Sequence, residues 1–219
     1  MGFRFQSSSC VVVGTFNIYI IQPKLLLEMG VIPTDCKVKL QSDFSHPGIR
    51  FELGDVRWNV RPERLAVESK NPEIDCGIAI GRLLEKLVWT PTMAVGVNTV
   101  FLGDAETEQQ LPEHFKLPTT AKFETVQRTC HVSCRSGDSV LNLQLNYNAG
   151  KEGAQPAVQL MLNVHTNLSE KNETRTQIEL NASARQACNS FLKQREEVVD
   201  FASTILECQD FSYDVNDVE

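Results

Sequence analysis

The stretch that decides the fold class is IRFELGDVRWNVR, residues 49–61. Apolar and polar residues alternate on both sides of Gly54-Asp55, as they do on strands that bury one face. A glycine-first pair between two such runs is typical of a two-residue type II′ turn. The stretch therefore predicts a β-hairpin, and Leu65 and Val67 predict a third strand after Pro62.

The same alternation returns in the second half of the chain, at residues 139–147 and 156–165. Both runs place apolar residues on one face and uncharged polar residues on the other, which indicates an antiparallel sheet with one face in water. A further strand is expected at about 120–134. The alternation of Phe16, Ile18 and Ile20 predicts the first strand of the chain.

Two longer helices are expected beside these strands. Asn71-Pro72-Glu73 has the features of a helix start, and Thr90-Pro91 those of a helix end. Ser183 and Gln186 match a capping box, which predicts the start of a long C-terminal helix. The predicted fold is therefore α+β: a predominantly antiparallel sheet, either one large or two smaller, with a mid-chain helix and a long C-terminal helix packed on it.

The chain is expected to form a single domain over residues 1–209. Its interior could be two-lobed, with lobes at about 1–102 and 119–209, separated by an acidic loop at 103–118. Residues 210–219 are acidic and are expected to form a flexible tail.

Composition excludes several classes of protein. A hydrophobic content of 42% and a charged content of 22% in 219 residues are those of a globular protein and not of a disordered one. A net charge of −7 argues against general coating of nucleic acid. Seven scattered cysteines, an odd number, indicate reduced thiols and a cytoplasmic location. No stretch approaches the roughly 20 apolar residues of a membrane-spanning helix, so no membrane partner is expected.

The motif that most resembles a metal-binding site is the five-residue segment from Cys130 to Cys134, with His131 between the two thiols. On an extended strand these thiols lie about 13 Å apart, too far for one metal ion, so two small core residues are the preferred interpretation. Neither a nucleophile-elbow motif nor a phosphate-binding loop occurs. We therefore expect no cofactor, no metal site and no catalytic residues.

Candidate binding residues fall into three groups. A basic concentration on the first hairpin and its neighbour could bind an anion or nucleic acid, although a solvated face with ion pairs is the preferred interpretation. The uncharged amide face of the second group of strands could contact a partner. An arginine interrupts the apolar stripe of the C-terminal helix and packs either within its own chain or on a partner. The residues are Arg50, Arg57, Arg61 and Arg64; Asn163 and His165; and Arg195.

These observations lead to one expected function and two alternatives. The first is a non-enzymatic cytosolic binding or assembly subunit that acts through protein–protein contacts, with a protein partner or a homo-oligomer. The second is a nucleic-acid or anion-binding protein that uses the arginine-rich face. The third is a hydrolase or transferase with a site around His131 and His165.

Overall fold

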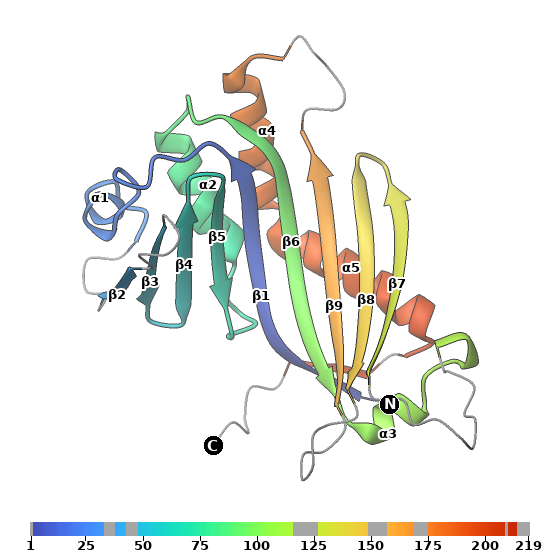
Figure 1. Ribbon diagram of the computed structural model, residues 1–219. Helices are drawn as coiled ribbons and strands as arrows, with labels where there is room; N and C mark the ends of the chain where they lie inside the picture. Colours follow the sequence, from blue (N-terminus) through green and yellow to red (C-terminus); the bar gives the residue numbers. More distant parts are fainter. Residues whose placement is uncertain are drawn as a thin grey trace.

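One large β-sheet organises the chain, and helices cover one of its two faces (Figure 1). The computed structural model describes residues 2–32, 38–42, 48–115, 127–148, 157–168, 175–208 and 210–213. The predicted α+β class with a predominantly antiparallel sheet is confirmed, and the sheet is one large sheet and not two smaller ones.

Nine strands cross the sheet in the order β2-β3-β4-β5-β1-β6-β9-β8-β7, and each is antiparallel to its neighbours. A short tenth strand, β10, pairs with the start of β1 in parallel. The bounds are β1 Gly2–Gly14, β2 Val38–Ser42, β3 Ile49–Leu53, β4 Val56–Arg61, β5 Arg64–Ser69, β6 Thr92–Gly103, β7 Gln127–Ser136, β8 Ser139–Asn148, β9 Ala157–Asn167 and β10 Asp210–Ser212.

The hairpin predicted over residues 49–61 is present as β3 and β4. Its turn is Gly54-Asp55, and Gly54 has a φ of 58°. The hairpin of β7 and β8 has the same design, because Gly137-Asp138 forms the turn and Gly137 also has a φ of 58°. A positive φ at the first turn residue alone is the type II′ arrangement, which suits the twist of the flanking strands.

The two halves of the sheet have the same connectivity. A long central strand, β1 or β6, is followed by a meander that returns to lie beside it, β2 to β5 or β7 to β9, and then by a helix. The two central strands pair with each other along most of their length. The halves therefore share one continuous hydrogen-bonded sheet.

The helices are α1 Pro23–Glu28, α2 Cys76–Lys86, α3 Ala105–Gln109, α4 Gln177–Asn189 and α5 Phe191–Leu206, with a 3-10 turn at Glu113–Phe115. Helix α2 packs on β1 and β5, α4 packs on β6, and α5 crosses β6, β8 and β9 on the same face (Figure 1). The main core lies between this helical layer and the sheet, and Trp58, Phe101 and Phe191 are buried in it.

Helices α2 and α4 approach each other closely because α2 has glycine where they meet. A Cβ atom on Gly77 would lie 1.9 Å from the backbone oxygen of Cys188, and one on Gly81 would lie 2.3 Å from Oδ1 of Asn189. Glycine at these positions lets the helix of the first half contact the helix of the second half. The side of α2 that carries Gly77 and Gly81 therefore packs against α4.

The helix boundaries differ from those predicted. Helix α2 begins after Asp75, whose carboxylate accepts hydrogen bonds from the N–H groups of Gly77 and Ile78. The capping box of the C-terminal region is formed by Thr176 and Glu179, and the predicted single helix is divided at Ser190 into α4 and α5. Sequence reasoning chose the wrong start because several polar residues in each region could cap a helix.

Three other expectations also differ from the structure. The first strand is Gly2–Gly14, and residues 17–20 lie in a turn region. The predicted acidic loop contains α3 and the 3-10 turn. The predicted flexible tail begins instead with β10, because Phe211 stacks on Phe3 with ring centroids 5.6 Å apart. Aromatic packing thus holds residues 210–212 in a strand, although the acidic composition of the tail predicted flexibility. The rest of the predicted tail, residues 214–219, lies outside the described residues.

Candidate binding face

The helices leave one face of the sheet uncovered, and we call it the open face (Figure 1). Polar side chains such as Asn98, Asn142 and Asn163 line a hollow on it. Alternation along each strand sends apolar residues to the helical layer and their neighbours to the open face. On β9, for example, Leu160 and Leu162 are buried, whereas Met161 and Asn163 are not.

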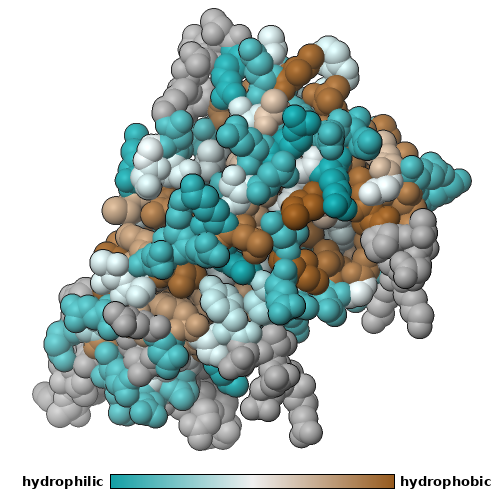
Figure 2. All heavy atoms as spheres, turned by 180° about the vertical axis from the view of Figure 1, so that it is seen from behind, coloured by the Kyte–Doolittle hydropathy of each residue, from teal (hydrophilic) through white to brown (hydrophobic). Residues whose placement is uncertain are grey.

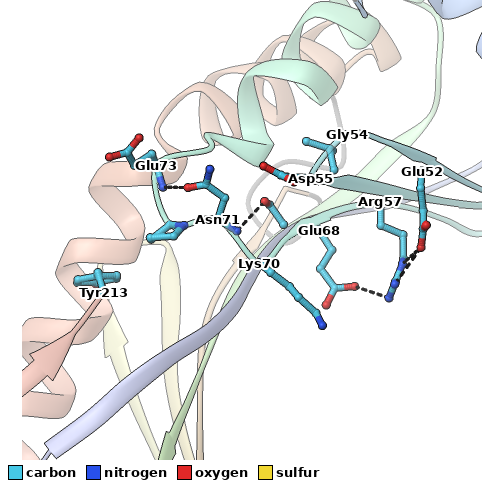
Figure 3. A pocket seen from close by; sticks show the side chains of 12 residues that line it. Glu52, Gly54, Asp55, Arg57, Glu68, Lys70, Asn71, Glu73 and Tyr213 are labelled. Atoms are coloured by element: carbon cyan, nitrogen blue, oxygen red, sulfur yellow. Dashed lines mark hydrogen bonds and ion pairs between the residues drawn. The ribbon is translucent and has the colours of Figure 1, made fainter. Parts of the chain in front are cut away.

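Four guanidinium groups lie on the half of the open face formed by β3, β4 and β5. Arg57 lies between two carboxylates, with Nη2 2.9 Å from Glu52 and Nη1 3.9 Å from Glu68 (Figure 3). The other three are Arg50, Arg61 and Arg64, and none of them forms an ion pair within the described ranges of the chain. Arg61 lies directly opposite Arg64 across the β4–β5 pair.

Amide side chains form a hydrogen-bonded series on the other half of the open face. Asn163 is at its centre: its Nδ2 donates to Oδ1 of Asn98 at 2.8 Å, and its Oδ1 accepts from Nδ2 of Asn142 at 3.0 Å. Ser133 donates to Asn142 at 2.7 Å, and Asn98 donates to Ser9 at 3.1 Å. Every bond points the same way, from β7 towards β1, so the dipoles add and polarise one another.

The series and the arginine half belong to one line of residues across the sheet. Ser9 lies opposite Glu68, Glu68 opposite Arg57, and Arg57 opposite Glu52. Eight consecutive strands thus each contribute one polar residue in register, and we call this line the polar row. Its members are Glu52, Arg57, Glu68, Ser9, Asn98, Asn163, Asn142 and Ser133.

A hollow of about 430 Å³ lies over the centre of the open face. Arg50, Arg57 and Arg64 line it from the first half of the chain, and Asn142, Asn163 and His131 from the second. Its volume is in the range of small-ligand sites. The hollow therefore brings together the two surfaces that the sequence singled out separately.

The remaining predicted site residues lie elsewhere. Arg61 and His165 are on the open face but do not line the hollow. Arg195 lies on the helical side, where Nη1 donates to the backbone oxygen of Pro72 at 2.7 Å and the guanidinium lies over the Tyr213 ring. Arg195 therefore packs within its own chain, and it does not join the other candidates.

The geometry of the two histidines bears on the hydrolase or transferase alternative. Strand β8 lies between β7 and β9, so His131 pairs with Gln144, which in turn pairs with Met161, four residues before His165. Two strand spacings and four residues place the imidazoles roughly 16 Å apart. Ser133 lies 3.5 Å from His131, but its hydroxyl donates to Asn142.

The described cysteines are all free thiols, and four of them, Cys10, Cys76, Cys188 and Cys208, are buried. Cys10 and Cys188 have their sulfur atoms 3.7 Å apart; this contact, followed by burial, raises the pKa of Cys10 well above its ordinary value. Burial raises the pKa of Cys76 to about 12. Within the described ranges, no cluster of three or more His, Cys, Asp or Glu residues could hold a metal ion.

The pentad from Cys130 to Cys134 forms part of β7 and is only partly in the core. Cys130 is half-buried, whereas Cys134 is exposed, so the prediction of two core thiols is wrong for Cys134. The reason is topological: β7 is the last strand of the sheet, and none of the described strands lies beside its outer edge.

Two further hollows have a different character. One of about 620 Å³ adjoins the β3–β4 turn and is lined by several carboxylates together with Arg57 and Lys70 (Figure 3). The other, of about 300 Å³, is apolar and lies beside the exposed Trp89 and Ile20. Apolar side chains also gather on the helical side of the molecule (Figure 2).

Sequence reasoning missed Ser9 and Asn98 as members of the polar row. Both belong to central strands, and no local pattern distinguishes them from other polar residues. Only the pairing of β1 with β6 and of β6 with β9 places them beside Asn163.

Comparison with known proteins gives no relative from which to transfer a function. No protein-family model matches the chain, and no curated protein matches its sequence. Among the described helices, none has the length and apolar character needed to cross a membrane.

Proposed function

We propose that the protein is a non-catalytic binding subunit that holds an acidic segment of a protein partner on the open face of its sheet. The observation that carries this proposal is the hollow in which Arg50 and Arg64, which have no ion-pair partner among the described residues, lie beside neutral amides. These cationic groups gather on one face of a chain whose net charge is −7.

The arginines supply the attraction for a negatively charged group. Four guanidinium groups share their half of the open face with Glu52 and Glu68, which leaves a local net charge of +2. Arg57 is occupied by the two carboxylates, whereas Arg50 and Arg64 have no acidic partner in the described part of the chain. A guanidinium fork matches a carboxylate in a bidentate geometry, so these two are the expected contacts.

The amides supply contacts of the kind that a peptide backbone needs. Asn142, Asn163 and Gln144 offer both donors and acceptors without the desolvation cost of a charge. No Phe, Tyr or Trp ring is among the described residues that line the hollow, and His131 is the one residue there with a ring for a base of single-stranded nucleic acid to stack on. An acidic peptide therefore suits the hollow better than a nucleic acid does.

Binding by the hollow is also favoured over catalysis there. Its described lining residues include one imidazole, His131, and no thiol. Nucleophilic catalysis needs a nucleophile and a base in contact and oriented by a third group. The Ser133 hydroxyl donates its hydrogen to Asn142 and not to His131.

Fluorescence anisotropy with two labelled probes, a ten-residue glutamate peptide and a single-stranded DNA decamer, tests the proposal. We expect the peptide to bind more tightly than the DNA, and raising the salt from 50 to 200 mM to weaken its binding. The double variant Arg50→Ala/Arg64→Ala should lower the affinity at least tenfold.

The matched control is Arg82→Ala, which removes an exposed guanidinium from α2 on the helical side. It should leave the affinity for the peptide within a factor of two. Tighter binding of the DNA, lost in the double variant, would support the nucleic-acid alternative. Peptide affinity that falls equally in the double variant and the control would overturn the assignment of the open face.

A further inference from the structure

Strand β7 forms one end of the sheet, and no described strand pairs with its outer edge. It has ten residues and pairs with β8 without a register shift from Gln127 to Ser136 (Figure 1). The strand at the opposite end, β2, has only five residues. A long regular edge is a template for another strand, because its outward backbone groups have no partner within the sheet.

Proline, lysine and bulges, three of the devices that protect an edge, are absent from β7, whose arginines are the buried Arg128 and the exposed Arg135. Natural sheets blunt their edges with proline, lysine, bulges or very short strands. Residues 127–136 include no proline and no lysine, and the ladder with β8 has no bulge. This edge is therefore able to accept a strand.

The hairpin turn fixes which backbone groups point outward. Ser136 and Ser139 flank the two-residue turn and so form a hydrogen-bonded pair in the ladder. Hydrogen-bonded pairs alternate along an antiparallel ladder, so the even-numbered residues of β7 bond to β8. The odd-numbered residues, among them His131 and Ser133, direct their N–H and C=O groups away from the sheet.

We propose that β7 pairs with β7 of a second copy of this chain, antiparallel, with Val132 opposite Val132 of the partner subunit. In this register His131 lies opposite the partner subunit's Ser133, and Arg135 lies opposite the partner subunit's Thr129. Moving the axis to Ser133 places Arg135 opposite His131, and moving it to His131 places two histidines opposite each other. The register centred on Val132 therefore sets each basic side chain against a hydroxyl.

The same register brings thiols together in two symmetric pairs. Cys130 lies opposite the partner subunit's Cys134, in a non-hydrogen-bonded pair with Cα atoms about 4.5 Å apart. This separation is within the range that a disulfide spans. Within one chain the two thiols lie about 13 Å apart along the strand and cannot join.

Oxidative cross-linking reads out this register directly. Copper-phenanthroline with dissolved O₂ removes two electrons and two protons from a thiol pair, forms the S–S bond and reduces O₂ to H₂O₂. We expect a cross-linked dimer of the native chain, resolved by non-reducing electrophoresis and assigned to the peptides of Cys130 and Cys134 by mass spectrometry.

Two single variants make the test specific. Cys130→Ser and Cys134→Ser should each give less than one tenth of the native cross-link, because each lacks one member of both pairs. An equimolar mixture of the two variants should recover about half of it, because about half of the dimers are mixed and a mixed dimer retains one complete pair. Cross-linking of either variant alone to the native extent would overturn the register.

A backbone variant tests the dimer without oxidation. His131→Pro removes an outward N–H group and keeps the ladder with β8, whereas His131→Ala removes the side chain alone and is its matched control. In sedimentation velocity we expect His131→Pro to weaken dimerisation at least tenfold and His131→Ala to change it less than threefold, with circular dichroism reporting the fold of both. A monomeric native chain at 100 μM, or equal dimerisation of both variants, would refute the proposal.

Discussion

The two halves of the sheet repeat one connectivity but present different chemistry on the open face. The first half, around β3, β4 and β5, presents guanidinium and carboxylate groups, whereas the second half, around β7, β8 and β9, presents amides and hydroxyls. Their helices, α2 and α4, contact each other at glycines. The comparison teaches that a shared layout constrains the core and the turns, while the exposed rows are free to differ.

The contact between α2 and α4 gives the largest expected effect. Gly77→Ala places a Cβ atom 1.9 Å from a backbone oxygen, so we expect the free energy of unfolding to fall by about 2 to 3 kcal/mol in urea denaturation. Gly96→Ala is the control, since its nearest neighbour would be 3.5 Å away, and it should change stability by less than about 1 kcal/mol. Equal effects would mean that the halves do not depend on this contact.

Removing one polar residue from each half measures how differently the two open-face halves are stabilised. Asn163→Ala removes the hydrogen bonds that Asn163 makes to Oδ1 of Asn98 and to Nδ2 of Asn142, and it should cost about 1 to 2 kcal/mol. Arg57→Ala breaks ion pairs whose side chains are partly exposed to water, and it should cost less than about 1 kcal/mol. Chemical denaturation compares them, and a larger loss for Arg57→Ala would reverse this ranking.

The equivalent turns should respond alike. Gly54→Ala and Gly137→Ala each force an alanine to a φ of 58°, at a cost of about 1 kcal/mol. Thermal unfolding should show similar decreases in both variants, while Asp55→Ala, which keeps the glycine, should show a smaller one. A decrease confined to one hairpin would show that the repeated turns are not equivalent in energy.

Asp75 gives the smallest effect, a pH trend that belongs to the first half. Burial raises the pKa of this capping carboxyl above its ordinary 3.8, although hydrogen bonds from Ile78 and Gly77 oppose the rise. Because the pKa of Asp75 is higher in the folded state than in the unfolded state, protonation of Asp75 stabilises the fold. This stabilisation is fully present below the unfolded pKa and is lost as the pH rises through the folded pKa. Asp75→Asn keeps an acceptor oxygen without the charge, so it should become more stable relative to the native chain between pH 3 and pH 7. A stability difference that stays constant over this range would contradict the assignment.

The sequence predicted those elements correctly whose structure depends on residues that are close together in the chain. The Gly54-Asp55 turn and the alternation along β8 and β9 depend on neighbours in sequence, and both are found as predicted. Helix starts were less predictable, because Asp75 and Thr176 compete with other capping residues nearby. Packing against β1 decides whether the C-terminal segment forms β10, and no local pattern contains that information.

The candidate site was predictable in its residue types but not in its assembly. Arg50, Arg57 and Arg64 were found from their spacing on one hairpin and its neighbour, and Asn163 from the amide face of another strand. That these two surfaces meet in one hollow depends on β1 and β6 pairing at the centre of the sheet. Strand order is a long-range property, so it could not be read from the spacing of residues.

The polar row also acts as a check on how the strands align. Its eight members come from eight separate strands. A register shift of one residue in any of these strands would place that strand's polar residue in the hydrophobic core and expose an apolar side chain on the open face. A slip of two residues would break the line without burying a polar group. A wrong register in any of the eight strands is therefore less stable than the native register. An intact polar row is found only when all eight strands are correctly aligned.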